Sequence, residues 1–266
     1  SKRFSSIMKQ IKLKDTDTLY ILGDVIDRYP DGIRILRKIM KMDNVKMLLG
    51  NHEHMMLKAL KTKSEEDDFL NPYGTSLWYR NGGRVTHNYL KHIRKDLRRE
   101  VFAYLTTLPI NIEIEVNDKK YLLVHGAPER NFRRAHGEYE TSKEYAVWHR
   151  WKVFEFVPEE YTLIFGHTPT INFNDKIPTE VFFSDNAIGI DCGCGCISLF
   201  KIQSKAYDCA ILAVLCGMCS KFLAVQLIQS VNDGGVVIGG THRPDGIAAL
   251  VEGLLGICAH TGIDDA

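Results

Sequence analysis

The stretch "LYILGDVIDRYPDG", residues 19–32, decides how the rest of the chain is interpreted. Its first four residues are apolar or aromatic and predict a short buried strand over residues 19–22. Three charged residues, Asp24, Asp27 and Arg28, follow directly. In open α/β sheets, ligands bind outside the carboxyl ends of the strands. Charge gathered at this strand end therefore indicates a functional site.

The overall composition is that of an ordinary globular protein. The chain has 266 residues, of which 45% are hydrophobic and 25% charged, with a formal net charge of +1. This balance implies neither nucleic acid nor a membrane surface as a partner. Residues 209–228 are rather apolar, but Ser220, Lys221 and Gln226 interrupt them before a full bilayer span. Since no leader sequence opens the chain, we expect a cytoplasmic protein.

The cysteines are confined to the last part of the chain. Their odd number and clustering do not suit a secreted disulfide framework. A zinc site would need a second C-x-x-C unit beside Cys216 and Cys219. We therefore expect reduced structural thiols, with a metal cluster as the alternative. The seven residues are Cys192, Cys194, Cys196, Cys209, Cys216, Cys219 and Cys258.

Short apolar runs alternate with helical periodicity through the first 202 residues. After the opening strand, Asp31 can cap a helix, and residues 45–49 read as the next strand. Such a β-α-β unit predicts an α/β fold with a parallel or mixed sheet covered by helices. Asn117-Asp118 between two alternating runs predicts a hairpin over residues 110–124. Further predicted elements are a helix over residues 4–13 and strands over residues 162–165 and 197–202.

A polar residue that can bind a metal follows each of four strands. Any one of them alone is more often a helix cap or a hydrogen-bonded core histidine. Four at matching positions are harder to explain by packing, and the glycine beside each allows a sharp turn. We therefore predict one shared site. The four stretches are Gly23-Asp24, Gly50-Asn51-His52-Glu53, His125-Gly126 and Gly166-His167-Thr168.

The chain resembles the phosphoprotein phosphatase family of the calcineurin-like metallophosphoesterase superfamily in four motifs. They occur in the order GDVIDR, GNHE, HG and GHT. WYRNGG, at residues 78–83, and WHR, at residues 148–150, resemble the bacterial and phage-type serine/threonine protein phosphatases in particular. The resemblance covers residues 1–202 and implies a sandwich of two mixed β-sheets flanked by helices. Residues 203–266 form a Cys/Gly-rich tail that does not match the family.

The resemblance implies a centre of two divalent metal ions. Such a pair can share and acidify a bridging water that attacks the phosphorus. Asp24 would bridge the ions, while Asn51, His125 and His167 would complete the shell of the second ion. Oxygen and imidazole ligands suit Mn, Fe or Zn, and Mn is the expected metal.

The resemblance also assigns the remaining charged residues. His52 would protonate the leaving oxygen, and Asp27 would orient it. Arg28 and Arg150 would hold the phosphate beside Asn51, because each guanidinium matches two oxygens. Glu53 would support the loop.

Two features depart from the family pattern. Tyr29 stands where the family has glycine and would change access of the substrate. The Asp-x-His-Gly motif of the family's first strand would fall before Ser1, so we expect one tightly held metal ion in this chain. Three explanations stay open: a fragment, a one-metal or inactive phosphate-binding protein, or a substitute strand over residues 235–242 that offers His242 as a ligand.

The expected reaction is hydrolysis of phosphomonoesters, with serine/threonine phosphoprotein as the substrate. A dinucleoside polyphosphate or another small phosphoester is the alternative within the same fold. A catalytically impaired phosphate-binding module is the alternative from another class. The basic runs at residues 91–100 and 130–134 lack interleaved aromatics and predict solvated helix faces. The sequence indicates no oligomeric state.

Overall fold

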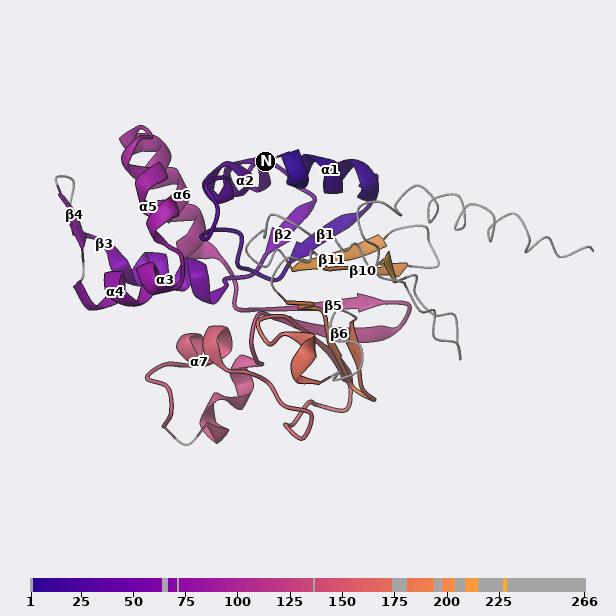
Figure 1. Ribbon diagram of the computed structural model, residues 1–266. Coiled ribbons are helices and arrows are strands. Elements are labelled where there is room, and N and C mark those ends of the chain that lie inside the picture. The colour runs from indigo at the N-terminus through magenta and orange to yellow at the C-terminus, as the bar shows by residue number, and fades with distance from the viewer. Residues whose placement is uncertain are drawn as a thin grey trace, which may run out of the picture.

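The computed structural model describes residues 2–63, 67–70, 72–135, 137–173, 181–193, 198–203, 209–214 and 227–228. Within these ranges the chain forms two five-stranded sheets that carry helices on their outer sides (Figure 1). This arrangement confirms the predicted α/β sandwich of two mixed sheets flanked by helices.

The first sheet has the strand order β12-β10-β11-β1-β2. Strand β1 pairs in parallel with β2 on one side and with β11 on the other. The helices α1 (Lys2–Ile11) and α2 (Gly32–Ile39) cover its outer face (Figure 1). Asp31 occupies the predicted cap position before α2, although its side chain makes no capping hydrogen bond. The strands are β1 (Thr18–Ile21), β2 (Val45–Met47), β10 (Ser198–Gln203), β11 (Cys209–Val214) and β12 (Leu227–Ile228).

The second sheet has the order β5-β6-β7-β9-β8. Its β5–β6 hairpin confirms the predicted turn, since Asn117 and Asp118 have φ angles of 54° and 61°, as a two-residue type I′ turn requires. Strands β6, β7 and β9 run in parallel. The strands are β5 (Asn111–Val116), β6 (Lys119–Val124), β7 (Tyr161–Phe165), β8 (Phe182–Phe183) and β9 (Ala187–Gly189).

Three apolar layers hold the molecule together, and strand alternation explains them. Leu19 and Ile21 of β1 face the core beneath the helices, while Leu22 joins the core between the sheets. On β6, Leu123 faces that middle core and Val124 faces the outer one. Successive side chains of a strand point to opposite faces, so each central strand contributes to two cores. This double burial fixes the register of the strands that lead to the site.

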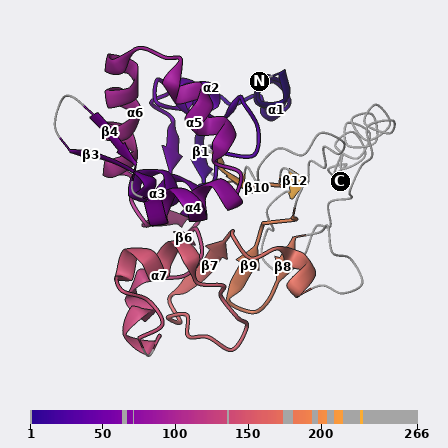
Figure 2. The same cartoon turned by 60° about the vertical axis from the view of Figure 1, so that its left-hand side comes forward.

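The connection between β2 and β5 carries most of the helices. The hairpin of β3 (Leu60–Lys63) and β4 (Asp67–Leu70) projects away from both sheets (Figure 2). Helix α7 lies in the half of the molecule that holds the second sheet (Figure 1). No helix among the described residues is long and apolar enough to cross a bilayer. The helices are α3 (Asn51–Ala59), α4 (Pro72–Arg80), α5 (Arg84–Lys91), α6 (Lys95–Thr107) and α7 (Ser142–Trp148), with 3-10 turns η1 (Glu129–Arg134) and η2 (Thr170–Asn172).

The tail contributes β11 to the first sheet. Its register pairs Ile211 with Leu19 and Ala213 with Ile21. The proposed division of the chain after residue 202 stays a prediction, as does the substitute strand over residues 235–242 with His242, which lies outside the described residues. Cys192 is buried and belongs to the middle core.

Candidate functional site

Four polar side chains from both sheets meet at one end of the sandwich. Asp24 follows β1, Asn51 opens α3 after β2, His125 follows β6, and His167 follows β7. Ligand atoms of Asp24, His125 and His167 all lie within 4.8 Å of one another. The amide oxygen of Asn51 lies 3.0 Å from Nε2 of His125 and 3.0 Å from Nδ1 of His167. The structure thus brings together the four residues predicted as metal ligands.

Two backbone carbonyls fix the tautomers of the two histidines. Nδ1 of His125 donates to the carbonyl of Leu22 at 2.5 Å. Nε2 is therefore unprotonated, and its lone pair faces the cluster. Nε2 of His167 donates to the carbonyl of Trp148 at 3.1 Å, which leaves Nδ1 facing the cluster. Backbone carbonyls commonly hold metal-binding histidines in this way.

The amide of Asn51 completes a cluster made of acceptors. The oxygen of the Asn51 amide faces the lone pairs of the two imidazoles. If the amide were rotated by half a turn, its nitrogen would face both imidazoles and both carboxylate oxygens of Asp24. A carboxylate and two imidazole lone pairs that converge without a cation repel one another. Adding the amide oxygen gives the mixed O/N donor set that divalent Mn, Fe or Zn accepts, so these residues fit a bound metal ion.

The backbone around these residues is strained. Asp24 and His167 have φ angles of 58° and 60°, in the left-handed region that non-glycine residues rarely adopt. Gly50 passes directly beneath Asp24, since a Cβ at Gly50 would lie 2.3 Å from Oδ1 of Asp24. Strain of this kind persists where surrounding contacts over-determine the conformation, and it is common at functional sites.

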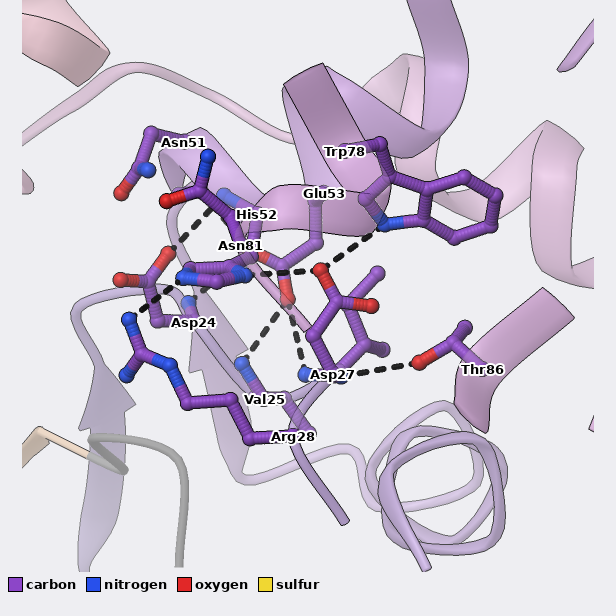
Figure 3. Close-up of polar contacts among 12 residues, drawn as sticks. Asp24, Val25, Asp27, Arg28, Asn51, His52, Glu53, Trp78, Asn81 and Thr86 are labelled. Atoms are coloured by element: carbon purple, nitrogen blue, oxygen red, sulfur yellow. Dashed lines mark hydrogen bonds and ion pairs between the residues drawn. The ribbon is translucent and has the colours of Figure 1, made fainter. Parts of the chain in front are cut away.

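His52 and Asp27 form a buried pair beside the cluster. Nδ1 of His52 donates to Oδ2 of Asp27 at 2.7 Å, and the backbone N–H of His52 donates to Oδ1 of Asp24 at 3.1 Å (Figure 3). Burial acts to lower the pKa of His52, but the charges of Asp24 and Asp27 outweigh it and raise the pKa above its usual value. The pairing therefore favours the protonated ring, as proton donation requires.

The two predicted phosphate-binding arginines have different surroundings. Nη2 of Arg28 donates to Nε2 of His52 at 3.0 Å, so this guanidinium lies against the proton-donor pair (Figure 3). Nη1 of Arg150 donates to the carbonyl of His167 at 3.0 Å. Arg150 thus stabilises the loop that carries His167, and its role in phosphate binding stays a prediction. Tyr29 is half-buried, and its N–H donates to the carbonyl of Asp27.

Glu53 supports the loop from below. Its fully buried carboxylate accepts backbone N–H groups from Asp24, Val25, Ile26 and Gly50 at 2.8–3.2 Å (Figure 3). Burial and the charge of Asp24 raise the pKa of Glu53 to about 7. These contacts stabilise the sharp turn after β1, because the N–H groups of Asp24, Val25 and Ile26 receive an acceptor although they lie outside a helix or strand.

Sequence reasoning assigned no role to three residues near the site. Trp78 and Thr86 contact Asp27 from α4 and α5, at 2.8 and 2.9 Å. Asp191 follows β9 and is buried; burial raises its pKa, and the nearby charge of Asp24 raises it further. Its position after a strand is the signal that could have identified it, because four other strands in the chain end in the same way.

A comparison with family models identifies the family of most of the chain. The model described as "Calcineurin-like phosphoesterase" matches residues 1–191. This range holds every residue of the cluster, the His52–Asp27 pair and both arginines.

Curated relatives match over shorter stretches. A symmetrical bis(5'-nucleosyl)-tetraphosphatase of Acidovorax sp. (strain JS42) is 43% identical over 49 residues, which is 18% of this chain and 17% of that protein. Proteins of the same name match from Delftia acidovorans, with 48% identity over 44 residues (16% of each chain), and from Erwinia tasmaniensis, with 33% over 73 residues (24% of this chain, 27% of the other). The matched stretches span 16 to 27% of the length of these relatives.

Two solved structures are similar in outline. A metallophosphoesterase from Sphaerobacter thermophilus aligns with a TM-score of 0.41 and 14% identity, over 79% of this chain and 69% of the other. A hypothetical protein from Pyrococcus horikoshii OT3 aligns with a TM-score of 0.39 and 13% identity, over 80% of each chain.

Proposed function

The chain belongs to the calcineurin-like phosphoesterase family, and from that premise we propose that it hydrolyses phosphoesters at the cluster formed by Asp24, Asn51, His125 and His167. Divalent metal ions, when bound there, supply positive charge for the phosphoryl oxygens and an acidified water as the nucleophile. The observation that carries the proposal is the buried His52–Asp27 pair, which lies directly beside this cluster and against Arg28.

The chain's own residues have distinct tasks in this reaction. Arg28 turns its guanidinium from Nε2 of His52 to the phosphate, where its fork matches two oxygens. Once Arg28 has left Nε2 of His52, this nitrogen takes up a proton from solvent, faces the leaving oxygen and gives it that proton. Asp27 stabilises the charged ring through Nδ1, at 2.7 Å. General acid catalysis of this kind contributes about 10² to 10⁴ in rate.

A dinucleoside polyphosphate is the first candidate substrate. Its support is that the curated relatives with matching stretches carry the name symmetrical bis(5'-nucleosyl)-tetraphosphatase. Those stretches are short, so the substrate is a proposal that rests on the similarity of local sequence. The metal centre and the proton donor serve a phosphoanhydride and a phosphomonoester alike, because both present a phosphoryl group and a leaving oxygen.

Serine/threonine phosphoprotein is the second candidate. Its support is the resemblance of residues 78–83 and 148–150 to bacterial and phage-type protein phosphatases. Trp78 and Arg150 lie near the site, where the indole of Trp78 donates to Asp27 and the guanidinium of Arg150 donates to the carbonyl of His167. We propose Mn as the metal, with Fe and Zn as the alternatives that the donor set also accepts.

One assay series tests the proposal. Purified protein is given Mn²⁺ and, separately, diadenosine tetraphosphate, a phosphoserine peptide and p-nitrophenyl phosphate, as the 266-residue chain and as the same chain preceded by an Asp-x-His-Gly strand. We expect hydrolysis that His52→Gln and Asp24→Asn remove and His92→Gln, an exposed histidine, leaves intact. The preferred substrate decides between the two candidates. Absence of hydrolysis in both forms with all three substrates would contradict the enzyme assignment in favour of a phosphate-binding module.

A further inference from the structure

The proton-donor pair has a third member, and it comes from a helix that the reaction does not otherwise use. Building on the proposed function, we infer that Trp78 is a positioning residue, whose indole N–H sets the orientation of Asp27 and, through it, the orientation of His52.

The inference begins with the oxygens of Asp27. Oδ2 accepts two hydrogen bonds, from Nδ1 of His52 at 2.7 Å and from Nε1 of Trp78 at 2.8 Å (Figure 3). Oδ1 is buried and has no hydrogen-bond partner among the described residues. The backbone N–H of Asp27 is held separately, because it donates to Oγ1 of Thr86 at 2.9 Å. The indole therefore fixes the orientation of the carboxylate toward His52.

Burial makes this dependence strong. Trp78 has no exposed surface, and the side chains of Asp27 and His52 are 0% and 2% exposed. Water thus has little access to replace a lost donor. Hydrogen bonds to a charged acceptor are stronger in such surroundings, and a missing partner is costly. Without the indole N–H, Asp27 can rotate and weaken its hold on the imidazole.

Gly83, which follows α4, allows the backbone to pack against the indole of Trp78. A Cβ at Gly83 would lie 2.3 Å from Nε1 and Cδ1 of Trp78, so the backbone there packs flat against the ring. The φ angle of Gly83 is −68°, which any residue adopts, so close approach is the reason for glycine at this position. Gly82, at φ +94°, accepts the N–H of Arg28 through its carbonyl. The segment from Trp78 to Gly83 therefore contacts both Asp27 and Arg28.

This role predicts a particular kinetic signature. A proton donor matters most when the leaving oxygen is a poor leaving group, and least when the leaving group is stable without a proton. Misorienting His52 should therefore slow hydrolysis of phenyl phosphate more than that of p-nitrophenyl phosphate. Loss of general stability would slow both substrates equally.

The test compares Trp78→Phe with Trp151→Phe. Both remove a buried indole N–H, but Nε1 of Trp151 has no hydrogen-bond partner among the described residues. For Trp78→Phe we expect kcat on phenyl phosphate to fall about 10-fold, with less than about 3-fold loss on p-nitrophenyl phosphate and an unchanged KM. Trp151→Phe should keep the ratio of the two substrates. Equal losses on both substrates in Trp78→Phe, or none, would overturn the inference.

A second measurement does not depend on activity. The chain has three tryptophans, so ¹H–¹⁵N spectra contain three indole signals that the Trp→Phe variants assign. We expect Asp27→Asn to move the Trp78 signal and to leave that of Trp151 in place. A Trp78 signal that ignores Asp27→Asn would overturn the inference. If the wild-type protein hydrolyses no phosphoester, the proposed function fails while this spectrum still decides the contact.

Discussion

The carboxylate of Glu53 accepts the backbone N–H of Asp24 at 2.9 Å, and so ties the helix that carries Asn51 and His52 to the loop that carries Asp24 and Asp27. The two segments are 29 residues apart in the chain. Because four N–H groups converge on this one carboxylate, the geometry of the metal cluster and of the proton-donor pair depends on it.

Replacing Glu53 by glutamine tests this dependence. Glutamine has one acceptor oxygen, so its NH₂ group would face two of the four backbone donors. We expect Glu53→Gln to lower the free energy of unfolding by about 2–3 kcal/mol, since buried donors lose their acceptor. Urea unfolding measures the loss, and Glu100→Gln on the exposed face of α6 is the matched control. Equal stability of the two variants would contradict a structural role for Glu53.

Metal binding should stabilise the fold. A ligand that binds only the folded state at 100 times its Kd adds about 2.7 kcal/mol to the free energy of unfolding. We expect Mn²⁺ to raise the melting temperature of the wild-type protein and of His92→Ala, whose histidine is exposed. His125→Ala should lose most of this shift, and EDTA should reverse it in the wild type. A full shift in His125→Ala would remove His125 from the ligand set.

Arg28 should act on substrate binding through its shape as well as its charge. Lysine keeps the charge but lacks the fork that matches two phosphate oxygens. For Arg28→Lys we expect KM to rise about 10-fold, the size of a lost charge-assisted hydrogen bond. Arg34→Lys, an exposed arginine on α2 paired with Asp31 at 3.6 Å, serves as the control in the same steady-state assay. An unchanged KM in Arg28→Lys would place the phosphate elsewhere.

His54 should make the fold sensitive to acid. Burial, together with the charge of Lys58, lowers the pKa of His54 from 6.5 to about 4, and its Nδ1 has no hydrogen-bond partner among the described residues. The unfolded chain therefore takes up this proton first as pH falls. The contribution of His54 leaves the free energy of unfolding unchanged above pH 6.5 and lowers it between pH 6.5 and 4, by up to about 3 kcal/mol.

Urea titrations across this pH range measure the effect. His54→Gln should flatten the part of the curve that His54 contributes, while His92→Gln should keep the wild-type slope. Parallel curves for His54→Gln and the wild type would show that His54 does not carry the acid sensitivity.

Local patterns in the sequence predicted the elements near the site. The run before Gly23, the Asn117-Asp118 turn and the strand before Gly166 all form where the residues indicate, as β1, the β5–β6 turn and β7. Such elements depend on alternation, turn chemistry and glycine, which act over a few residues. The same patterns predicted that four strand ends converge, because parallel strands deliver their carboxyl ends to one edge.

The sequence by itself thus determined which residues follow the strands and which chemistry they offer. The tertiary structure alone decided how they are held: the carbonyl of Leu22 sets the tautomer of His125 across 103 positions, and Trp78 holds Asp27 across 51. It also placed β11 beside β1 and turned Arg150 toward the carbonyl of His167. Contacts between distant segments depend on how the layers pack. A periodic pattern within one segment does not predict that packing.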